Sequence, residues 1–598
     1  MMLWLNLFFI SIKLFFTRRI LFNGTDLELL FDSIFIALIL IGIYFLFKKK
    51  ANPFYIGFNV FISTVLLAII INFNYSGTIL TYESVAFMNQ VGEIGDSIFS
   101  LFHWRYLLLY ADIPLLVIIT LFKLTNKQLA TKYLMILSTA LLIVSIFRVV
   151  DKRDIINENI QAQRMGIFNY QLYVAYQNTF GKSISSEDIT QEHINQIKGI
   201  TSSEGTTNVY EGIAKDLNII VVQLEAFQDF TIDLSIDNQE ITPVLNKLVQ
   251  ESFYFTNVYQ QIGKGNTSDA EFVANTSIYP VGNQAMSKAY GDRAIPSLPR
   301  LLKEQGYVTT TFHSNDIKFW DRDQLYQALG FDYMYDKNFF GDIDVIAFGA
   351  SDEVLYRKSI EELSTFANED KKFYASVIAM SSHHPYQIPD HKVEIQLPEK
   401  YQNTPVGDYL TAVNYADFAL GELIEDLKRE NLWDNTMLVI YGDHFGLRLE
   451  AEQDRELMKD VIGRPYHPYI DHFNIPLIVR VPGQESKQID LLGGQIDIMP
   501  TVANLAGISL DQTIYFGQDL LNTNHNLVGM RYYLPTGSFL NDEVLFVPRE
   551  GFKDGSATTL ESKERLKEIT ALEGDFYKLL ELLQLSDAYV EMLPKRND

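Results

Sequence analysis

The chain has no cysteine in its 598 residues. This absence excludes structural disulfides, thiolate metal ligands and a cysteine nucleophile. Basic residues are scarce as well, because 49 Lys and Arg stand against 74 Asp and Glu, giving a formal net charge of −25 at pH 7. Affinity for a polyanion depends on neutralising its phosphates, so this charge argues against a nucleic-acid partner. Because the chain has no cysteine, the nucleophile and the metal ligands that it supplies must be oxygen or nitrogen groups.

Long apolar runs are concentrated in the first 150 residues. Hydrophobic residues make up 47% of the chain and aromatic residues 13%, which is more than a purely soluble domain needs. The five predicted membrane spans are residues 3–16, 29–47, 55–73, 105–122 and 131–149. The first is short and contains Lys13. The alternative, buried core helices of a soluble protein, is hard to reconcile with five runs that have no alternating polar face.

Basic residues beside these runs predict the orientation in the membrane. They lie in two loops, after the second run and between the fourth and fifth: Lys48–Lys50, and Lys123, Lys127 and Lys132. Such residues mark cytoplasmic loops, so five spans place everything after about residue 150 outside the cell. Arg18 and Arg19 lie on the side that this topology makes external, and they are the one objection to it.

Beyond residue 217, short apolar runs alternate with amphipathic stretches, which is typical of a mixed, mostly parallel α/β sheet covered by helices on both faces. We expect strands at 308–312, 373–379, 437–441 and 477–481, and a helix at 407–430. A small antiparallel sheet should follow residue 515, and a helix and tail should end the chain. The predicted parts are a multi-span α-helical membrane domain (1–150), a connector of helices and linker (151–210) and an α/β catalytic domain (211–598). Within the connector, residues 164–173 form an amphipathic stretch that could lie along the membrane surface; we expect it instead to pack on the catalytic domain.

The run from Gly263 to Phe272 places a Thr hydroxyl in a glycine-rich turn ahead of a predicted helix. Gly263 and Gly265 allow the backbone to approach a ligand closely, and the free N–H groups of the helix start favour a phosphate or an oxyanion. The Thr267 hydroxyl is unreactive at its own pKa, so a nucleophilic role requires a base or a metal beside it. Taken alone, such a turn is more often only a turn.

Two further segments supply metal ligands. Glu225 follows the apolar run 217–224, and Asp443 and His444 follow the run 436–442. Both runs are typical of buried parallel strands, whose carboxyl ends are where open α/β sheets place ligands. With the Thr267 oxygen they make a set of oxygen and nitrogen ligands without sulfur, which suits Mn²⁺ or Mg²⁺ at least as well as Zn²⁺.

With these residues the chain resembles the lipoteichoic acid synthase family, polyglycerolphosphate synthases whose catalytic domain has the sulfatase/alkaline-phosphatase-like fold. The resemblance covers nearly the whole chain. It implies that Thr267 is the nucleophile, that Glu225, Asp443 and His444 bind the metal with it, and that the metal is Mn²⁺, with Mg²⁺ as the alternative. Further matching segments imply a set of residues that contact the glycerolphosphate: His313, Asn315, Trp320, Arg322 and His383.

The resemblance also implies roles for the substrate-binding residues. Arg322 would clamp phosphate oxygens, Trp320 would wall the glycerol, and His383 would protonate a leaving alkoxide, as a residue with a pKa near neutrality should. Two plainer readings stay open: Trp320 as a core residue, and His384 as the structural member of the His pair. No role is assigned to His467 or His472.

The implied function is transfer of glycerolphosphate from phosphatidylglycerol to a glycolipid or lipoteichoic acid acceptor, outside a multi-pass cell membrane, with the cell-wall machinery as a further partner. A primase that adds only the first glycerolphosphate would share every residue named. A phosphoethanolamine transferase is disfavoured because the cysteines usual in those relatives are absent. A sulfatase is disfavoured because Ser297 to Arg300 matches the required motif only in part. The intact set around Thr267 argues against an inactive membrane scaffold.

Overall fold

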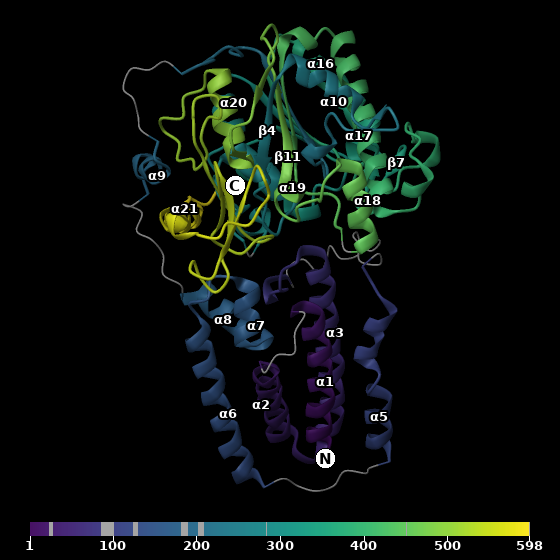
Figure 1. Cartoon of the computed structure of the whole chain (residues 1–598), viewed down its shortest axis with the longest axis vertical. Coiled ribbons are helices and arrows are strands. Elements are labelled where there is room, and N and C mark those ends of the chain that lie inside the picture. The colour runs from purple at the N-terminus through teal and green to yellow at the C-terminus, as the bar shows by residue number, and fades with distance from the viewer. Residues whose placement is uncertain are drawn as a thin grey trace. The chain divides into compact units, whose positions relative to one another are not determined.

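The computed structural model describes residues 1–22, 28–84, 101–122, 130–180, 189–200, 208–282, 284–449 and 451–596. They form two compact units (Figure 1). The helical unit comprises residues 1–183 with the loop segments 533–536 and 548–555, and the catalytic unit comprises the rest of the chain. Lys123 and Lys127, which contribute to the predicted orientation, lie outside the described residues. The predicted division at residues 150 and 210 stays a prediction.

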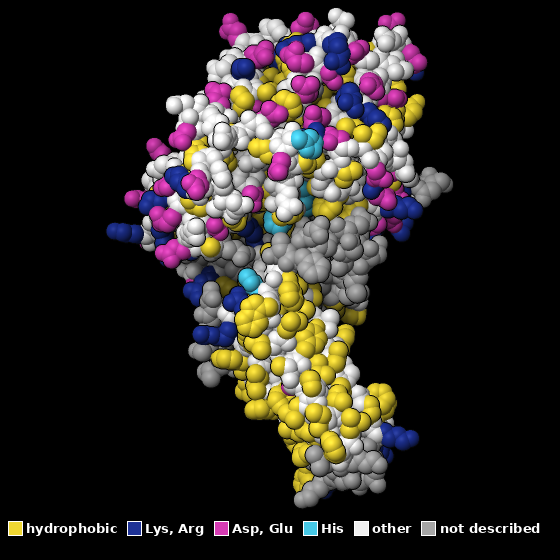
Figure 2. Space-filling model, turned by 90° about the vertical axis from the view of Figure 1, so that its right-hand side faces the viewer, with side chains coloured by type: hydrophobic (Ala, Val, Ile, Leu, Met, Phe, Trp, Pro, Cys, Tyr) yellow, Lys and Arg dark blue, Asp and Glu magenta, His cyan; other side chains and the backbone are white. Residues whose placement is uncertain are grey.

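Long helices dominate the helical unit: α1 (Met2–Phe22), α2 (Leu29–Phe47), α3 (Ala51–Ser76), α5 (Ile113–Leu121) and α6 (Thr131–Lys152). Four described segments are long and apolar enough to cross a membrane: Leu29–Phe47, Ala51–Ser76, Trp104–Leu121 and Thr131–Lys152. They coincide with the second to fifth predicted spans. The unit presents a largely hydrophobic surface with few charges (Figure 2), as helices facing lipid require. The predicted first span lies within α1, which is not among the four.

Two of the three basic residues of α1, Lys13 and Arg18, are buried and paired. Lys13 Nζ lies 2.6 Å from Asp112 Oδ1 and donates to Ser63 Oγ at 2.8 Å. Asn59 Nδ2 also donates to Asp112, at 3.0 Å, so this network joins α1 to α3 and to the residue before α5. Charges within membrane helices occur where they are paired with one another. Lys13 is therefore compatible with α1 as a fifth span.

Arg18 has its own carboxylate partner. Its Nη1 lies 2.8 Å from Asp32 Oδ2, and both side chains are almost fully buried. Its Nη2 donates to the carbonyl of Gln163 at 3.0 Å. A cation neutralised inside the helix packing is not a free flanking charge, so only the exposed Arg19 remains as an objection to the predicted orientation.

The amphipathic stretch at 164–173 is divided between two helices, α7 (Glu158–Met165) and α8 (Ile167–Phe180). They are separated at Gly166, which has a φ of 98°. The apolar side chains of residues 164–173 join the hydrophobic core of the helical unit, where Phe168 stacks on Phe35 at 5.6 Å between ring centroids. The apolar surface of α1 to α3 therefore provides the partner for these side chains, and the expected packing on the catalytic domain stays a prediction.

A mixed, mostly parallel sheet forms the centre of the catalytic unit, as predicted. Its main strand order is β12-β4-β11-β10-β1-β9-β5-β6. The strands are β1 (Asn218–Leu224), β4 (Phe253–Tyr259), β5 (Val308–His313), β6 (Tyr333–Tyr335), β9 (Phe373–Ile378), β10 (Thr436–Gly442), β11 (Asn474–Arg480) and β12 (Lys487–Ile489). Strand β11 runs antiparallel to both β10 and β4, whereas β10, β1, β9, β5 and β6 are parallel.

Side chains alternate between the two faces of β1. Ile220, Val222 and Leu224 join one core with residues of helices that lie together on one side of the strands in Figure 1: α10 (Pro243–Leu248), α16 (Asp352–Asn368) and α17 (Pro405–Arg429). Gln223 points to the other face, where its Nε2 donates to the carbonyl of Thr267 at 3.2 Å, at the start of α11 (Thr267–Thr276). Both faces are therefore covered, and β1 is buried along its length, as expected of a central parallel strand.

The carboxyl-terminal part forms the predicted small antiparallel sheet and helix. The sheet contains β14 (Leu527–Met530), β15 (Ser538–Asn541), β16 (Val544–Val547) and β17 (Ser556–Thr559), in that order, and α21 (Glu573–Met592) follows. Helix α21 packs closely on β14: a Cβ on Gly529 would lie 2.4 Å from Leu579 Cδ1. A larger residue at position 529 would require the Leu579 side chain to shift.

We predict that Lys13→Met destabilises the helical unit, because it leaves Asp112 buried without its cation. Removing one partner of a buried ion pair costs roughly 3–5 kcal/mol, whereas replacing both partners is often neutral. The double variant Lys13→Met, Asp112→Asn should regain most of the loss, since the amide oxygen introduced at position 112 can still accept from Asn59. Thermal unfolding in detergent micelles measures both effects. Equal melting temperatures for wild type and Lys13→Met would show that the pair contributes nothing to the packing of α1.

Candidate functional site

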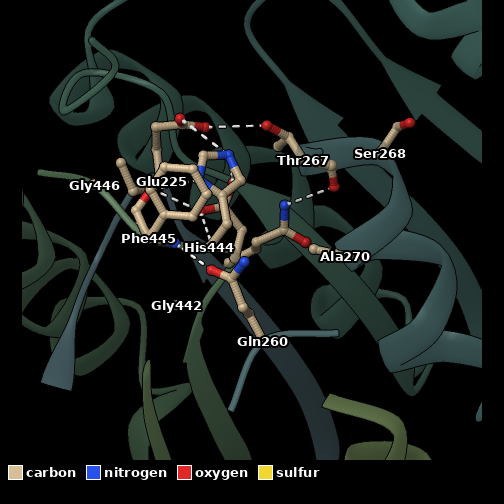
Figure 3. Close-up of polar contacts among 12 residues, drawn as sticks. Glu225, Gln260, Thr267, Ser268, Ala270, Gly442, His444, Phe445 and Gly446 are labelled. Atoms are coloured by element: carbon tan, nitrogen blue, oxygen red, sulfur yellow. Dashed lines mark hydrogen bonds and ion pairs between the residues drawn. The ribbon is translucent and has the colours of Figure 1, made fainter. Parts of the chain in front are cut away.

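Three chain segments meet at one edge of the catalytic sheet. Strands β1 and β10 pair in parallel with Leu224 opposite Gly442, so the residues that follow, Glu225 and Asp443, leave the sheet side by side. Thr267 approaches as the first residue of α11. Figure 3 shows Glu225, Thr267 and His444 directed toward one another.

The predicted metal ligands are close together and buried. Glu225, Asp443 and His444 each offer one ligand atom, and these atoms all lie within 4.8 Å of one another. His444 Nε2 is 3.4 Å from Asp443 Oδ2 and 3.7 Å from Glu225 Oε1. The Thr267 hydroxyl donates to Glu225 Oε2 at 3.3 Å. The structure thus brings together all four residues that the sequence predicts for this centre.

The hydrogen bonds around these residues fit a bound cation. Asp443 Oδ1 accepts from the backbone N–H groups of Ala226 and His444, both at 2.7 Å. Its Oδ2 is buried with no hydrogen-bond partner among the described residues. His444 Nδ1 faces the carbonyl of Phe445 at 2.8 Å; a carbonyl only accepts, so Nδ1 carries the proton and Nε2 keeps its lone pair, as in metal-binding histidines.

The charges of the cluster also favour a bound cation. Burial raises the pKa of Glu225 well above its usual value, and the neighbouring Asp443 carboxylate raises it further. Two buried carboxylates cannot both ionise cheaply without a positive charge between them. A divalent cation removes this cost, and the donor set of two carboxylates, one imidazole and one hydroxyl suits Mn²⁺, Mg²⁺ or Zn²⁺.

The turn before Thr267 is organised by Asp269. Its Oδ2 accepts from the N–H of Gly265 at 2.8 Å, and its Oδ1 accepts from the N–H of Met286 at 2.9 Å. A Cβ on Gly265 would lie 2.4 Å from Asp269 Oδ1, and one on Gly263 would lie 2.8 Å from the carbonyl of Val281. The glycines are thus required by the packing of the turn itself, whereas the sequence interpretation assigned them to ligand approach.

Three buried glutamines, here called the glutamine clamp (Gln228, Gln260 and Gln495), hold the loop that carries Asp443 and His444. Gln495 Nε2 donates to the carbonyls of residues 442 and 443 at 3.2 and 2.6 Å. Gln260 Oε1 accepts from the N–H of residue 445 at 2.5 Å (Figure 3). Gln228 Oε1 accepts from the N–H groups of residues 446 and 447 at 3.3 and 3.1 Å. Sequence reasoning missed all three, because an isolated Gln has no pattern that separates it from a surface residue.

Arg322 and His313 lie near the metal-ligand cluster. Arg322 is 1% exposed and His313 is 5% exposed. The pKa of His313 is lowered well below its usual value, first by burial and then by the charge of Arg322. Arg322 also opposes the rise in the pKa of Glu225, for which burial is the largest cause. The Arg322 charge therefore acts on both residues, which favours an anionic ligand beside the cluster.

His383 differs from the expectation of a pKa near neutrality. Burial is the largest cause that lowers its pKa to about 4. Its Nδ1 faces the carbonyl of His384 at 2.7 Å, and its ring meets Phe348 edge-on at 4.7 Å. His383 is thus neutral at pH 7 with Nδ1 protonated, so its Nε2 accepts a proton or hydrogen bond more readily than it donates one.

The remaining predicted residues have mixed settings. Trp320 is half-buried in a left-handed conformation (φ 59°) two residues before Arg322, outside the main core. Asn315 is buried, and its Oδ1 accepts from the N–H of Asp316 at 2.7 Å. His472, to which no role was assigned, stacks on Phe445 at 4.3 Å and so packs beside the metal-ligand loop. The roles of Trp320 and Asn315 stay predictions.

Comparison with known proteins agrees with this geometry. The lipoteichoic acid synthase N-terminal domain matches residues 1–186, and the sulfatase domain matches residues 217–508. Lipoteichoic acid synthase 1 of Bacillus subtilis is 31% identical over 560 residues, covering 87% of this chain and 85% of that protein. The chain belongs to the lipoteichoic acid synthase family. It is accordingly an enzyme, a phosphotransferase.

Other relatives support the assignment. Lipoteichoic acid synthase of Staphylococcus aureus is 29% identical, over 84% of this chain and 80% of that protein. The crystal structure of the lipoteichoic acid synthase LtaP from Listeria monocytogenes has 42% sequence identity and a TM-score of 0.65, covering 68% of this chain and all of that chain. An alkaline phosphatase superfamily protein from Vibrio parahaemolyticus, at 21% identity, a TM-score of 0.55 and coverage of 69% of this chain and 98% of that chain, shares the fold.

We predict that Asp443→Asn weakens Mn²⁺ binding on the order of a hundredfold. Its Oδ1 can still accept from Ala226 and His444, so the loop stays in place, while an amide replaces the oxygen that faces the cluster. The metal-free variant should also melt at a higher temperature than the wild type, because repulsion with Glu225 is lost.

Asp417→Asn is the matched control, because Asp417 is a buried carboxylate that accepts from two backbone N–H groups away from the cluster. It should bind Mn²⁺ like the wild type. Elemental analysis should find one cation per chain, and chelation should remove activity that Mn²⁺ restores best. Two tightly bound zinc ions, or full activity in excess chelator, would contradict the proposed centre.

A second prediction concerns pH. Burial is the largest cause that lowers the pKa of His472 to about 3, whereas a histidine in the unfolded chain titrates near ~6.5. As the pH falls through ~6.5, the unfolded state binds a proton at His472 that the folded state does not bind. The contribution of His472 to the free energy of unfolding is therefore fully present above pH ~6.5 and is lost as the pH falls toward 3.

His472→Phe keeps the ring on Phe445 but cannot titrate. Between pH 7 and 5 the wild type should lose about 2 kcal/mol of unfolding free energy relative to this variant, as measured by urea unfolding of both proteins at both pH values. Shifts from buried carboxylates cancel in the difference. Parallel pH curves would show that His472 is not held neutral.

Proposed function

We propose that this enzyme transfers glycerolphosphate from phosphatidylglycerol and builds the polyglycerolphosphate chain of lipoteichoic acid through a covalent intermediate at Thr267. The observation that carries this proposal is the Thr267 hydroxyl at 3.3 Å from Glu225 Oε2, inside a cluster of two carboxylates and an imidazole. A hydroxyl in such a cluster is activated by the cation that the cluster binds. The relatives named above, which are lipoteichoic acid synthases, support the choice of substrate.

In the first step Thr267 Oγ1 attacks the phosphorus of the lipid phosphodiester, and the bond from phosphorus to the diacylglycerol oxygen breaks. The Thr267 hydroxyl loses its proton and the diacylglycerol oxygen gains one. A divalent cation held by Glu225, Asp443 and His444 would lower the pKa of the hydroxyl and stabilise charge on the phosphoryl oxygens. Gln223 holds the Thr267 carbonyl, so the nucleophile stays at a fixed position relative to β1. Arg322 lies beside the cluster and pairs with phosphoryl oxygens.

In the second step a terminal hydroxyl of the acceptor attacks the same phosphorus, and the bond to Thr267 Oγ1 breaks. The acceptor hydroxyl loses a proton and Thr267 regains one. His383 is neutral at pH 7, with its Nδ1 on the carbonyl of His384. It is therefore equipped to take the acceptor proton as a general base and to return it in the reverse direction. This assignment replaces the acid role expected from the sequence.

We also propose that α1 is a fifth span and that the catalytic unit is extracellular, where lipoteichoic acid would be assembled. The pairing of Lys13 with Asp112 and of Arg18 with Asp32 supports this topology. We fuse to the carboxyl terminus a reporter enzyme that functions only outside the cell. We expect this fusion to be active. Activity of a cytoplasmic reporter at the same position would overturn both the orientation and the lipid donor.

The function is tested with purified full-length enzyme, glycerol-labelled phosphatidylglycerol and Mn²⁺. We expect labelled polymer and free diacylglycerol from the wild type and neither from Thr267→Ala, which should remain folded because loss of this hydroxyl costs only on the order of 1 kcal/mol. Addition of a single glycerolphosphate to a glycolipid would identify a primase instead. Transfer from phosphatidylethanolamine alone, or lipid cleavage by Thr267→Ala, would overturn the proposal.

A further inference from the structure

Glu271 is a buried carboxylate that the proposed reaction does not yet use. It lies on α11 one turn after Thr267, so the two side chains share a helix face. Its Oε1 is 2.8 Å from Nε of Arg322, the first residue of α14 (Arg322–Leu329), and both side chains are 2% exposed. A buried ion pair is weak evidence for stability, because apolar residues of similar volume often serve as well. Its presence beside the nucleophile therefore calls for a functional reason.

The bond to Glu271 uses the inner nitrogen of the guanidinium. Among the described residues, the other protein contact of Arg322 is a long one, from Nη1 to the carbonyl of Phe319 at 3.4 Å. The fork of terminal amino groups is the part of an arginine that matches the oxygens of a phosphate. An acceptor at Nε thus fixes the side chain while leaving that fork for a ligand.

The backbone before Arg322 cannot by itself aim this fork. Trp320 (φ 59°) and Asp321 (φ 49°) are consecutive left-handed residues without being glycine, a conformation that persists where surrounding contacts enforce it. Asp321 is fixed by Lys288 at 2.7 Å. The long arginine side chain beyond this turn retains its rotamer freedom unless a second contact holds it. Glu271 supplies that contact.

We propose that Glu271 is a positioning residue: it holds Nε of Arg322 so that the terminal amino groups face the phosphoryl group being transferred at Thr267. Thr267 and Glu271 are four residues apart on α11. This one rigid helix therefore fixes the position of the nucleophile and, through Glu271, the position of the Arg322 guanidinium. The identity of that phosphoryl group rests on the proposed function; the coupling between Glu271 and Arg322 does not.

The coupling is tested with the full-length, Mn²⁺-loaded enzyme and inorganic phosphate as the probe, by calorimetry. Glu271→Met, which removes the acceptor at similar side-chain length, should weaken phosphate binding roughly ten- to a hundredfold and leave Mn²⁺ affinity unchanged. In an Arg322→Ala background the same substitution should change phosphate binding less than about twofold, because the residue through which it acts is gone. Arg322→Lys should also bind phosphate weakly, since an ammonium cannot serve Glu271 and a phosphate fork together.

Asn275→Ala is the matched control. Asn275 is buried one turn further along α11, where it donates to the carbonyl of Glu271 and accepts from Tyr374. Its loss should lower the melting temperature while phosphate affinity stays at the wild-type value. Wild-type phosphate affinity in Glu271→Met, or an equal loss with and without Arg322, would overturn the proposal. These outcomes are read without a lipid, so a failure of phosphatidylglycerol as substrate is distinguished from a failure of the coupling.

Discussion

The repulsion between Glu225 and Asp443 is the constraint on which the rest of the catalytic unit depends. Parallel pairing of β1 with β10 forces the two carboxylates to leave the sheet side by side, and burial makes their charges costly together. A cation between them would remove this cost, whereas without one the two side chains stay close at the expense of stability. Movement of the loop after β10 would separate the two carboxylates and lower the repulsion between them. The surrounding contacts prevent this movement.

That loop is prevented from moving by neutral groups. The glutamine clamp binds backbone atoms of residues 442 to 447 from three directions. Amides suit this task better than charged side chains would, because they satisfy buried N–H and C=O groups without altering the field at the cation. Gln223 does the same for Thr267 from β1. The ligands can therefore keep unfavourable positions in the empty protein and be ready for the metal.

Sequence reasoning located the strands and the residues of the candidate metal cluster because both leave local signals. An apolar run followed by Glu225, and another followed by Asp443 and His444, suffice to predict two buried strands whose ends meet. Helix α17 was predicted from residue 407 and begins at Pro405, since Thr404 caps it by accepting from the N–H of Gly407 at 3.1 Å. Such boundary errors are small because capping is also local.

What the sequence could not show depends on contacts between distant segments. The packing of residues 164–173 required the apolar surface of α1 to α3, and the lowered pKa of His383 required its burial beside His444. Two members of the glutamine clamp, Gln228 and Gln260, lie more than 180 positions from the loop that they hold, and Gln495 lies 52 positions from Asp443. Glu271 is an exception, because its spacing of four from Thr267 on a predicted helix was visible and was not used.

Charge pairing separates the carboxylates that maintain the fold from those that await a ligand. Asp32 and Asp112 in the helical unit, and Glu271 in the catalytic unit, each lie within 2.8 Å of a Lys or Arg nitrogen. Among the described residues Glu225 and Asp443 have no such cation and share only the imidazole of His444. The carboxylates of both groups are buried, but only those of the first group are paired with a cation. Burial alone therefore does not explain the difference. A divalent cation from outside the chain would supply the missing positive charge, and this difference in pairing is what supports the cluster as the proposed reactive centre.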